Sequence, residues 1–315
     1  MALPTVSSVS GSGVLASTQL LNATDVAGTI ACTFSTTGVA TLTFNFGYAY
    51  DTPPIVIFSA ANNVGAQNRN SVYATSSTTQ FTLNFTAGTT TNSIYNYHIF
   101  ETQTNNASSP WTWVGTGGGV TSSKCTDIAG CVTTAPSSIT SSIAGTCSFG
   151  YAYATAPIVV FSPADSASAG NVNNWWSNSS TSMFNLSANE NKPDANIFNY
   201  HIIETQSVNG SAPFNGVTLT NTSTASISNG TDTAGNISIS FAFTGGAQNT
   251  AFTFGYTYAT PPIVVISPTK AAAAAAMKVT FVNSTTTGFS INMKPPGVPT
   301  TATCTYAYHV IETQA

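Results

Sequence analysis

The feature that most constrains the fold is an internal threefold repeat. Three sequence blocks recur in the same order: TDVAG, TDIAG and TDTAG; then FGYAYDTPPIVIFS, FGYAYATAPIVVFS and FGYTYATPPIVVIS; then YNYHIFETQ, FNYHIIETQ and AYHVIETQ. The second block begins at Phe46, Phe149 and Phe254, so the copies are roughly a hundred residues apart. Self-similarity at a fixed period indicates that each copy is one structural unit.

Within a unit the hydrophobic period is two. Apolar residues alternate with small or polar ones at Leu42, Phe44, Phe46, Tyr48 and Tyr50, which is typical of a half-buried antiparallel strand. The runs IVIFS, IVVFS and IVVIS are continuous and β-branched, which predicts strands buried on both faces. Only the Ala-rich loop TKAAAAAAMK favours a helical turn. The sequence therefore predicts an all-β fold of three tandem small antiparallel β-sandwich domains, each with five to seven strands.

The predicted boundaries follow the repeat. They are an N-terminal arm 1–17, β-sandwich repeats 18–103, 123–206 and 227–314, and linkers 104–122 and 207–226. The linkers are rich in Gly, Ser, Thr and Asn. A linker of this length reaches at most roughly 65 Å, which leaves both a linear string of domains and a compact triangle open.

Charge limits the partners. Only 5% of residues are charged and the net charge is -4, so no basic stripe can neutralise a run of phosphates and nucleic acid is not expected as a partner. A weakly charged surface repels its own copies little. We expect partners that are other copies of the chain or other proteins of a virion or surface assembly.

The sequence lacks two features that would indicate insertion into a membrane or secretion. No apolar run approaches the ~20 residues of a membrane span, and the first residues lack the cationic and apolar regions of a secretory signal. The sequence therefore predicts neither a membrane span nor a signal peptide.

The third block pairs a His with a Glu three residues later. Residues three apart in a strand point to opposite faces, so Tyr95, Tyr97, Ile99 and Glu101 are expected on one face, and Asn96, His98 and Phe100 on the other. We interpret His98, His201 and His309 as markers of a repeated strand. An alternative stays open: these are the only histidines in the chain, and a pseudo-threefold arrangement would let them meet around a metal.

Other polar residues receive structural interpretations. Asp25, Asp127 and Asp232 of the first block precede Ala-Gly, where a short carboxylate accepts backbone N–H bonds in a turn. No nucleophile, phosphate-binding or zinc-protease motif is present. The prediction is a protein that is not an enzyme, with no catalytic residue, cofactor or metal.

Tryptophan and cysteine leave two alternatives each. Trp111, Trp113, Trp175 and Trp176 lie in polar surroundings; we favour packing between domains over stacking on sugar rings. The five cysteines do not recur with the repeat, which favours buried free thiols over one local bridge among Cys125, Cys131 and Cys147.

The pattern FGYAY, PPIVVFSP, STTTGF and YHVIETQ resembles the small β-sandwich repeats of virion surface, fibre and tail proteins of phages and large DNA viruses. More distantly, its order of strands and turns is similar to H-type lectin domains, although the chain ends in ETQ where those domains have an aromatic-rich motif. The first resemblance implies a structural protein of a virion or extracellular surface assembly, as a capsid-decorating, fibre or tail component that works as an oligomer. The second implies a carbohydrate-binding adhesion module with glycans as partners.

Overall fold

The computed structural model describes residues 5–13, 15–87, 90–101, 112–115, 118–123, 128–136, 143–150, 152–171, 175–188, 195–204, 214–220, 224–228, 230–231, 233–240, 247–293 and 303–312. These residues form six antiparallel sheets of four strands each, two sheets in every sequence repeat. Among them, no helix has the length and apolar character that a membrane crossing requires.

The first repeat contains β1 (Thr5–Gly11), β2 (Leu15–Leu21), β3 (Ala27–Phe34), β4 (Ala40–Asn45), β5 (Ile55–Ala60), α1 (Asn63–Gln67), η1 (Arg69–Ser71), β6 (Val72–Ser76), β7 (Gln80–Phe85) and β8 (Ser93–Phe100). Its sheets have the strand orders β1-β4-β7-β6 and β2-β3-β8-β5.

The second repeat contains β9 (Thr112–Gly115), β10 (Gly118–Ser123), β11 (Ala129–Pro136), β12 (Ile143–Ser148), β13 (Ile158–Pro163), α2 (Ser166–Asn171), β14 (Trp175–Ser179), β15 (Met183–Ala188) and β16 (Asn196–Ile203). Its sheets have the orders β9-β12-β15-β14 and β10-β11-β16-β13.

The third repeat contains β17 (Phe214–Thr220), β18 (Thr224–Ser228), β19 (Ala234–Ser240), β20 (Gln248–Phe254), β21 (Ile263–Pro268), α3 (Ala271–Ala276), η3 (Met277–Val279), β22 (Thr280–Thr285), β23 (Gly288–Met293) and β24 (Thr303–Ile311). Its sheets, β17-β20-β23-β22 and β18-β19-β24-β21, repeat the same topology.

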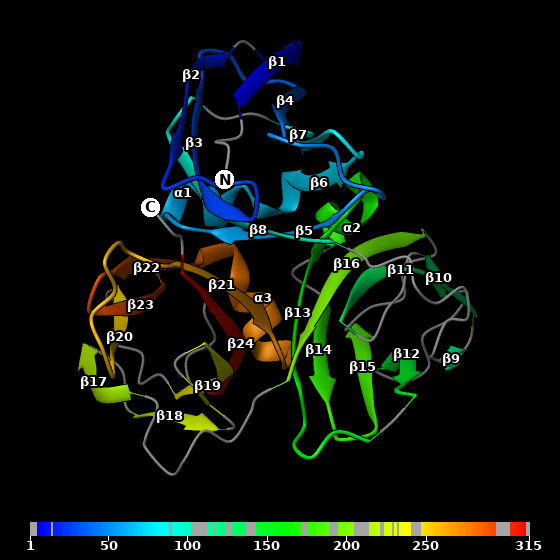
Figure 1. The fold of residues 1–315 in the computed structure, drawn as a ribbon, viewed down its shortest axis with the longest axis vertical. Helices are drawn as coiled ribbons and strands as arrows, with labels where there is room; N and C mark the ends of the chain where they lie inside the picture. Colours follow the sequence, from blue (N-terminus) through cyan, green and yellow to red (C-terminus); the bar gives the residue numbers. More distant parts are fainter. Residues whose placement is uncertain are drawn as a thin grey trace.

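The six sheets form a ring, the arrangement of a six-bladed β-propeller (Figure 1). Strands β5, β13 and β21 contact one another at the centre. The three sheets that contain them end at β2, β10 and β18, and the other three sheets run from β6, β14 and β22 to β1, β9 and β17. The predicted tandem repeat of three β-sandwich domains is therefore wrong. The two blades of one repeat do share a hydrophobic core, but faces that would be the outside of a separate domain pack against the other repeats.

The central strands explain this closure. Every residue of β5, β13 and β21 is buried, as the β-branched runs predict. Val56 and Phe58 enter the core of the first repeat, whereas Ile55 and Ile57 face a smaller cluster that also draws Ile158, Val160, Ala129, Ala234 and Ala307 from the other two repeats. We call this the axial cluster.

The described residues of the predicted arm and linkers belong to blades. β1, β9 and β17 pair with β4, β12 and β20, while β2, β10 and β18 pair with β3, β11 and β19. The six segments are thus the same two outer strands in three copies. Their Gly, Ser and Thr content conceals the strands, because an outer strand has little apolar surface to bury.

The first sequence block holds the other two blocks in place. Thr24 O accepts a hydrogen bond of 2.9 Å from the Tyr97 hydroxyl, and Asp25 Oδ1 accepts one of 3.0 Å from Gly47 N in the FGY turn. Gly28 leaves room for Tyr97, since a Cβ there would lie 2.7 Å from the tyrosine hydroxyl oxygen. These contacts explain why the three blocks recur together.

Short helices follow the central strands in all three repeats. The turn predicted in the Ala-rich loop is present as α3, whereas α1 and α2 were not predicted. Local capping forms them: Asn62 Oδ1 accepts from Gly65 N at 2.7 Å, and Asp165 Oδ1 accepts from Ser168 N at 2.7 Å. A polar residue of this type is the usual first cap of a helix.

Candidate functional site

The three histidines of the chain meet at the centre of the ring. His98, His201 and His309 lie on the middle strands β8, β16 and β24 of equivalent blades. Their ligand nitrogen atoms all lie within 4.8 Å of one another. The ring centroids are separated by 5.9 Å for His98 and His201, 5.0 Å for His98 and His309, and 5.3 Å for His201 and His309.

The strand register brings them together. Each His pairs with an Ala of the first block on one neighbouring strand and with a β-branched residue of the central strand on the other. In chain order these neighbours are Ala27 and Ile57 for His98, Ala129 and Val160 for His201, and Ala234 and Val265 for His309. The small Ala side chains leave space beside the imidazoles. The apolar residues on the other side enclose them.

Hydrogen bonds between repeats fix the ring around this cluster. Asn96 Nδ2 donates to Val264 O at 2.9 Å, which joins the first repeat to the third. Asn199 Nδ2 donates to Val56 O at 3.0 Å, and Ser267 Oγ donates to Val159 O at 3.3 Å. The three acceptors occupy the same position of the repeat, so the bonds close a cycle.

The imidazoles are buried without a full set of partners. His98 and His201 are 6% and 7% exposed, whereas His309 is only partly buried as a residue. The Nδ1 atom of all three histidines is buried with no hydrogen-bond partner. Burial lowers the pKa of His309 to about 4 and the pKa values of His98 and His201 well below their usual range, with repulsion from the neighbouring imidazoles as a smaller cause for those two. The cluster is neutral at pH 7.

Phe100 breaks the threefold symmetry at this site. Its ring centroid lies 3.7 Å from that of His98, 3.5 Å from that of His201 and 6.3 Å from that of His309. Together with the distances among the imidazoles, these values place Phe100 outside the triangle, beside its His98–His201 edge. The interior of the triangle is not filled by this ring.

The face assignment of the third block is confirmed, but the wider interpretation of the histidines was incomplete. Tyr95, Tyr97 and Ile99 enter the core of the first repeat, whereas His98 faces the axis. Glu101 is exposed beyond the end of β8, so it forms no pair with His98. The convergence left open as an alternative is the arrangement observed.

Of the three aspartates, only Asp25 lies in the described residues. It is 1% exposed, and its Oδ1 accepts from Gly47 N of the distant FGY turn. The backbone N–H groups of its own turn, those of Val26 and Ala27, donate to Thr24 Oγ1 instead, so the local turn interpretation of Asp25 is wrong. Its backbone carbonyl also accepts a 3.0 Å bond from the Tyr50 hydroxyl. Asp127 and Asp232 lie outside the described residues.

The four tryptophans differ in position. Trp175 is fully buried in the core of the second repeat, 5.0 Å from Phe198 between ring centroids. It therefore packs within one repeat, and neither the favoured packing between domains nor the sugar contact describes it. Trp113 belongs to β9, where its backbone pairs with Cys147. Trp111 lies outside the described residues.

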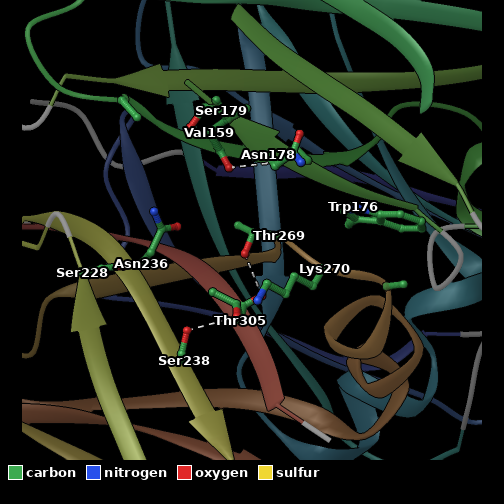
Figure 2. Close-up of a pocket in the computed structure, with 13 residues that line it drawn as sticks. Val159, Trp176, Asn178, Ser179, Ser228, Asn236, Ser238, Thr269, Lys270 and Thr305 are labelled. Carbon is green, nitrogen blue, oxygen red and sulfur yellow. Dashed lines mark hydrogen bonds between the residues drawn. The ribbon is translucent and has the colours of Figure 1, made fainter. Parts of the chain in front are cut away.

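Trp176 lines a cavity of about 400 Å³ between the second and third repeats (Figure 2). The other side chains around it are mainly hydroxyls and amides, among them Asn178, Asn236, Ser238 and Thr305, with Lys270 at its edge. Trp176 is only 8% exposed, so it presents little of its ring face to the cavity. Sequence reasoning found Trp176 but not Asn236, Ser238 and Thr305, because these side chains come from the third repeat and meet it only in the folded chain.

The favoured interpretation of buried thiols holds for Cys32, Cys147 and Cys304, whereas Cys131 is only partly buried. Cys32, Cys131, Cys147 and Cys304 form no disulfide, and Cys125 lies outside the described residues. Burial raises the pKa of Cys32 to about 12 and that of Cys304 to about 11, so both remain protonated. Cys131 packs against the axial cluster.

Arg69 is a buried cation that the sequence pattern did not single out. It is 2% exposed in η1, a segment that contacts α2 and η3 of the other repeats. Its two terminal guanidinium nitrogens have no hydrogen-bond partner. Burial lowers the Arg69 pKa to about 10, which still leaves the group charged at pH 7.

Comparison with protein-family models, curated proteins and solved structures gave no match to the chain.

Proposed function

We propose that the chain is a non-enzymatic structural protein of a virion or extracellular assembly, a capsid-decorating, fibre or tail component. The observation that carries the proposal is a pair of exposed tyrosines at the same position of two repeats. Tyr48 is 49% exposed and Tyr256 is 47% exposed, both in the FGY turn. Exposed aromatic side chains are enriched where proteins contact partners.

The turn that carries each tyrosine is fixed. The Tyr48 ring lies 4.5 Å from that of the buried Tyr50, and the Tyr256 ring lies 4.4 Å from that of the buried Tyr258. In the first repeat the buried Asp25 also holds Gly47, beside Tyr48. A side chain held before binding loses little conformational entropy when it meets a partner.

The surface around these tyrosines favours association. Only 5% of the chain is charged, so copies brought close together repel one another weakly. The ring displays the turns around an axis, which suits repeated contacts in a lattice, fibre or shell. The expected partner is another copy of the chain or another protein of the same particle.

Sedimentation of the chain over a wide concentration range tests the proposal, together with electron microscopy of the native particle. We expect self-association or binding to the particle, weakened in a Tyr48→Ser, Tyr256→Ser double variant whose melting temperature is unchanged. Val39→Ser is the matched control, because Val39 is 57% exposed outside these turns. A chain that stays monomeric at high concentration and binds no particle would refute the proposal.

A second candidate function is carbohydrate binding in the cavity between the second and third repeats. Its hydroxyl and amide lining matches the hydrogen-bonding groups of a sugar, and Trp176 supplies an aromatic edge. A glycan array tests it. Specific binding that is lost in both Asn178→Ala and Asn236→Ala, and retained in Tyr48→Ser, would favour this candidate over the assembly role.

A further inference from the structure

We propose that His98, His201 and His309 form a binding site for one divalent transition-metal ion of the zinc type, and that this ion ties the three repeats together at the axis. The proposal does not depend on the assembly function. It rests on the convergence of the histidines, on their unpaired nitrogen atoms and on their surroundings.

Convergence is the first support. The three side chains come from strands that are far apart in the sequence, and their ligand atoms lie within 4.8 Å of one another. Two nitrogen ligands of a tetrahedral zinc ion, each about 2.1 Å from the metal, are about 3.4 Å apart. The upper limit of 4.8 Å exceeds that spacing by about 1.4 Å, so ion binding requires the ligand atoms to approach one another by no more than this distance. Phe100 lies outside the triangle.

The unpaired nitrogen atoms are the second support. A buried polar atom without a partner costs free energy, typically about 1–3 kcal/mol, and this cluster has one such Nδ1 atom on each histidine. The same cost recurs at the same position of all three repeats. We assign these Nδ1 atoms as the ligands, because an ion that accepts a lone pair from each of them satisfies all three together.

The type of ion follows from the donor set. The group consists of three imidazoles, with no carboxylate among the described residues that belong to it. Calcium and magnesium require oxygen ligands, whereas imidazole suits zinc, copper, nickel and iron.

The enclosure gives the ion a structural consequence. Ile57, Val160 and Val265 neighbour the three histidines in the strand register and are at most 1% exposed. An ion held by one ligand from each repeat cross-links segments that otherwise meet through apolar contacts and a few hydrogen bonds. Metal binding in such a site adds to folding stability.

The test uses the full chain without an affinity tag, stripped with EDTA and titrated with zinc chloride by calorimetry. We expect one zinc ion per chain and a higher melting temperature that EDTA reverses. Replacing any one of the histidines by Gln should lower the zinc affinity by about 100-fold or more (His98→Gln, His201→Gln, His309→Gln). Loss of a residue that only hydrogen-bonds to a metal ligand already costs about 10–100-fold. Absence of saturable binding would overturn the proposal.

Cys131→Ser is the matched control, since Cys131 packs against the same axial cluster but is not one of the convergent groups. This variant should bind zinc as the unaltered chain does. X-ray absorption of the zinc-loaded unaltered chain covers the case in which a His variant fails to fold. Three imidazole ligands support the site, whereas sulfur ligation, or ligation by oxygen alone, overturns it.

Discussion

The three strands that carry the histidines, β8, β16 and β24, have two faces with different hydrogen bonding. On the core face of β8 and β24, the hydroxyls of Tyr97 and Tyr308 donate to Thr24 O at 2.9 Å and Thr231 O at 2.7 Å, so the polar tips of these buried aromatic rings are satisfied. On the axial face, each His of the same block keeps a buried nitrogen without a partner. The core face of β8 keeps one such atom of its own, the Tyr95 hydroxyl. Only on the axial face does the unpaired atom recur at the same position of all three repeats and converge with its counterparts, so that face is where an additional ligand has chemical reason to bind.

The largest expected effect is on the axial face and comes from pH. In the unfolded chain a His takes up a proton near pH 6.5, whereas burial lowers the pKa of His309 to about 4 and those of His98 and His201 well below their usual range. The unfolded state therefore binds more protons between about pH 6.5 and 4, so stability is full above that window and falls as the pH drops through it. Each histidine contributes up to about 1.4 kcal/mol per pH unit.

Denaturant unfolding in EDTA at pH 7.5 and pH 5 measures this dependence. A variant with all three histidines changed to Gln should show a much flatter profile over the same window. If the free energy of unfolding of the unaltered chain were the same at both pH values, the histidines would not be buried and neutral as the structure has them.

The second-largest expected effect comes from a substitution on the core face. Tyr97 is fully buried, so Tyr97→Ala leaves a cavity and should lower the free energy of unfolding by about 3–5 kcal/mol. Glu101→Gln, just beyond the end of the same strand, is the control. It should change the free energy of unfolding by less than about 0.5 kcal/mol, because Glu101 is exposed. Equal effects of the two substitutions, measured by chemical denaturation, would contradict the division of faces.

A smaller effect tests how the ring closes. Asn96→Ala removes the donor to Val264 O. The third repeat already has alanine, Ala307, at the equivalent position. The substitution should lower the free energy of unfolding by about 1–3 kcal/mol, because it leaves the buried Val264 carbonyl unpaired. Asn199→Ala should cost less, because Ser162 Oγ also donates to Val56 O, at 3.3 Å. If thermal unfolding showed Asn199→Ala to be the more destabilising of the two, the pairing of these carbonyls would not be what holds the repeats together.

The smallest expected effect concerns the buried cation. Arg69 and Met277 open the equivalent segments η1 and η3, and both are buried. Arg69→Met should raise the free energy of unfolding by about 1 kcal/mol, because it removes a buried charge without a partner and keeps an apolar side chain of similar length. Lower stability of the variant in urea unfolding would indicate that the guanidinium is paired in solution.

Much of the local structure was predictable. The period-two pattern around Phe44 and the β-branched runs at Val56, Val159 and Val264 indicate strands directly, since residue alternation is set by backbone geometry alone. The outer strands were not predictable, because segments such as Gly118–Ser123 carry few apolar side chains and resemble linkers. Helices α1 and α2 were missed because their caps, at Asn62 and Asp165, are ordinary residues of polar loops.

The candidate site shows the same division between sequence and tertiary structure. The sequence by itself determined that there are three copies of one strand, that Tyr97 and His98 point to opposite faces, and that the strands after the Pro residues are buried on both faces. Only the tertiary structure decided what the second face meets. Flexible segments of about 20 residues permit either separate domains or a closed ring, and the choice depends on the apolar contacts and hydrogen bonds between repeats, such as those of Asn96 and Asn199, which have no signature in the local sequence pattern.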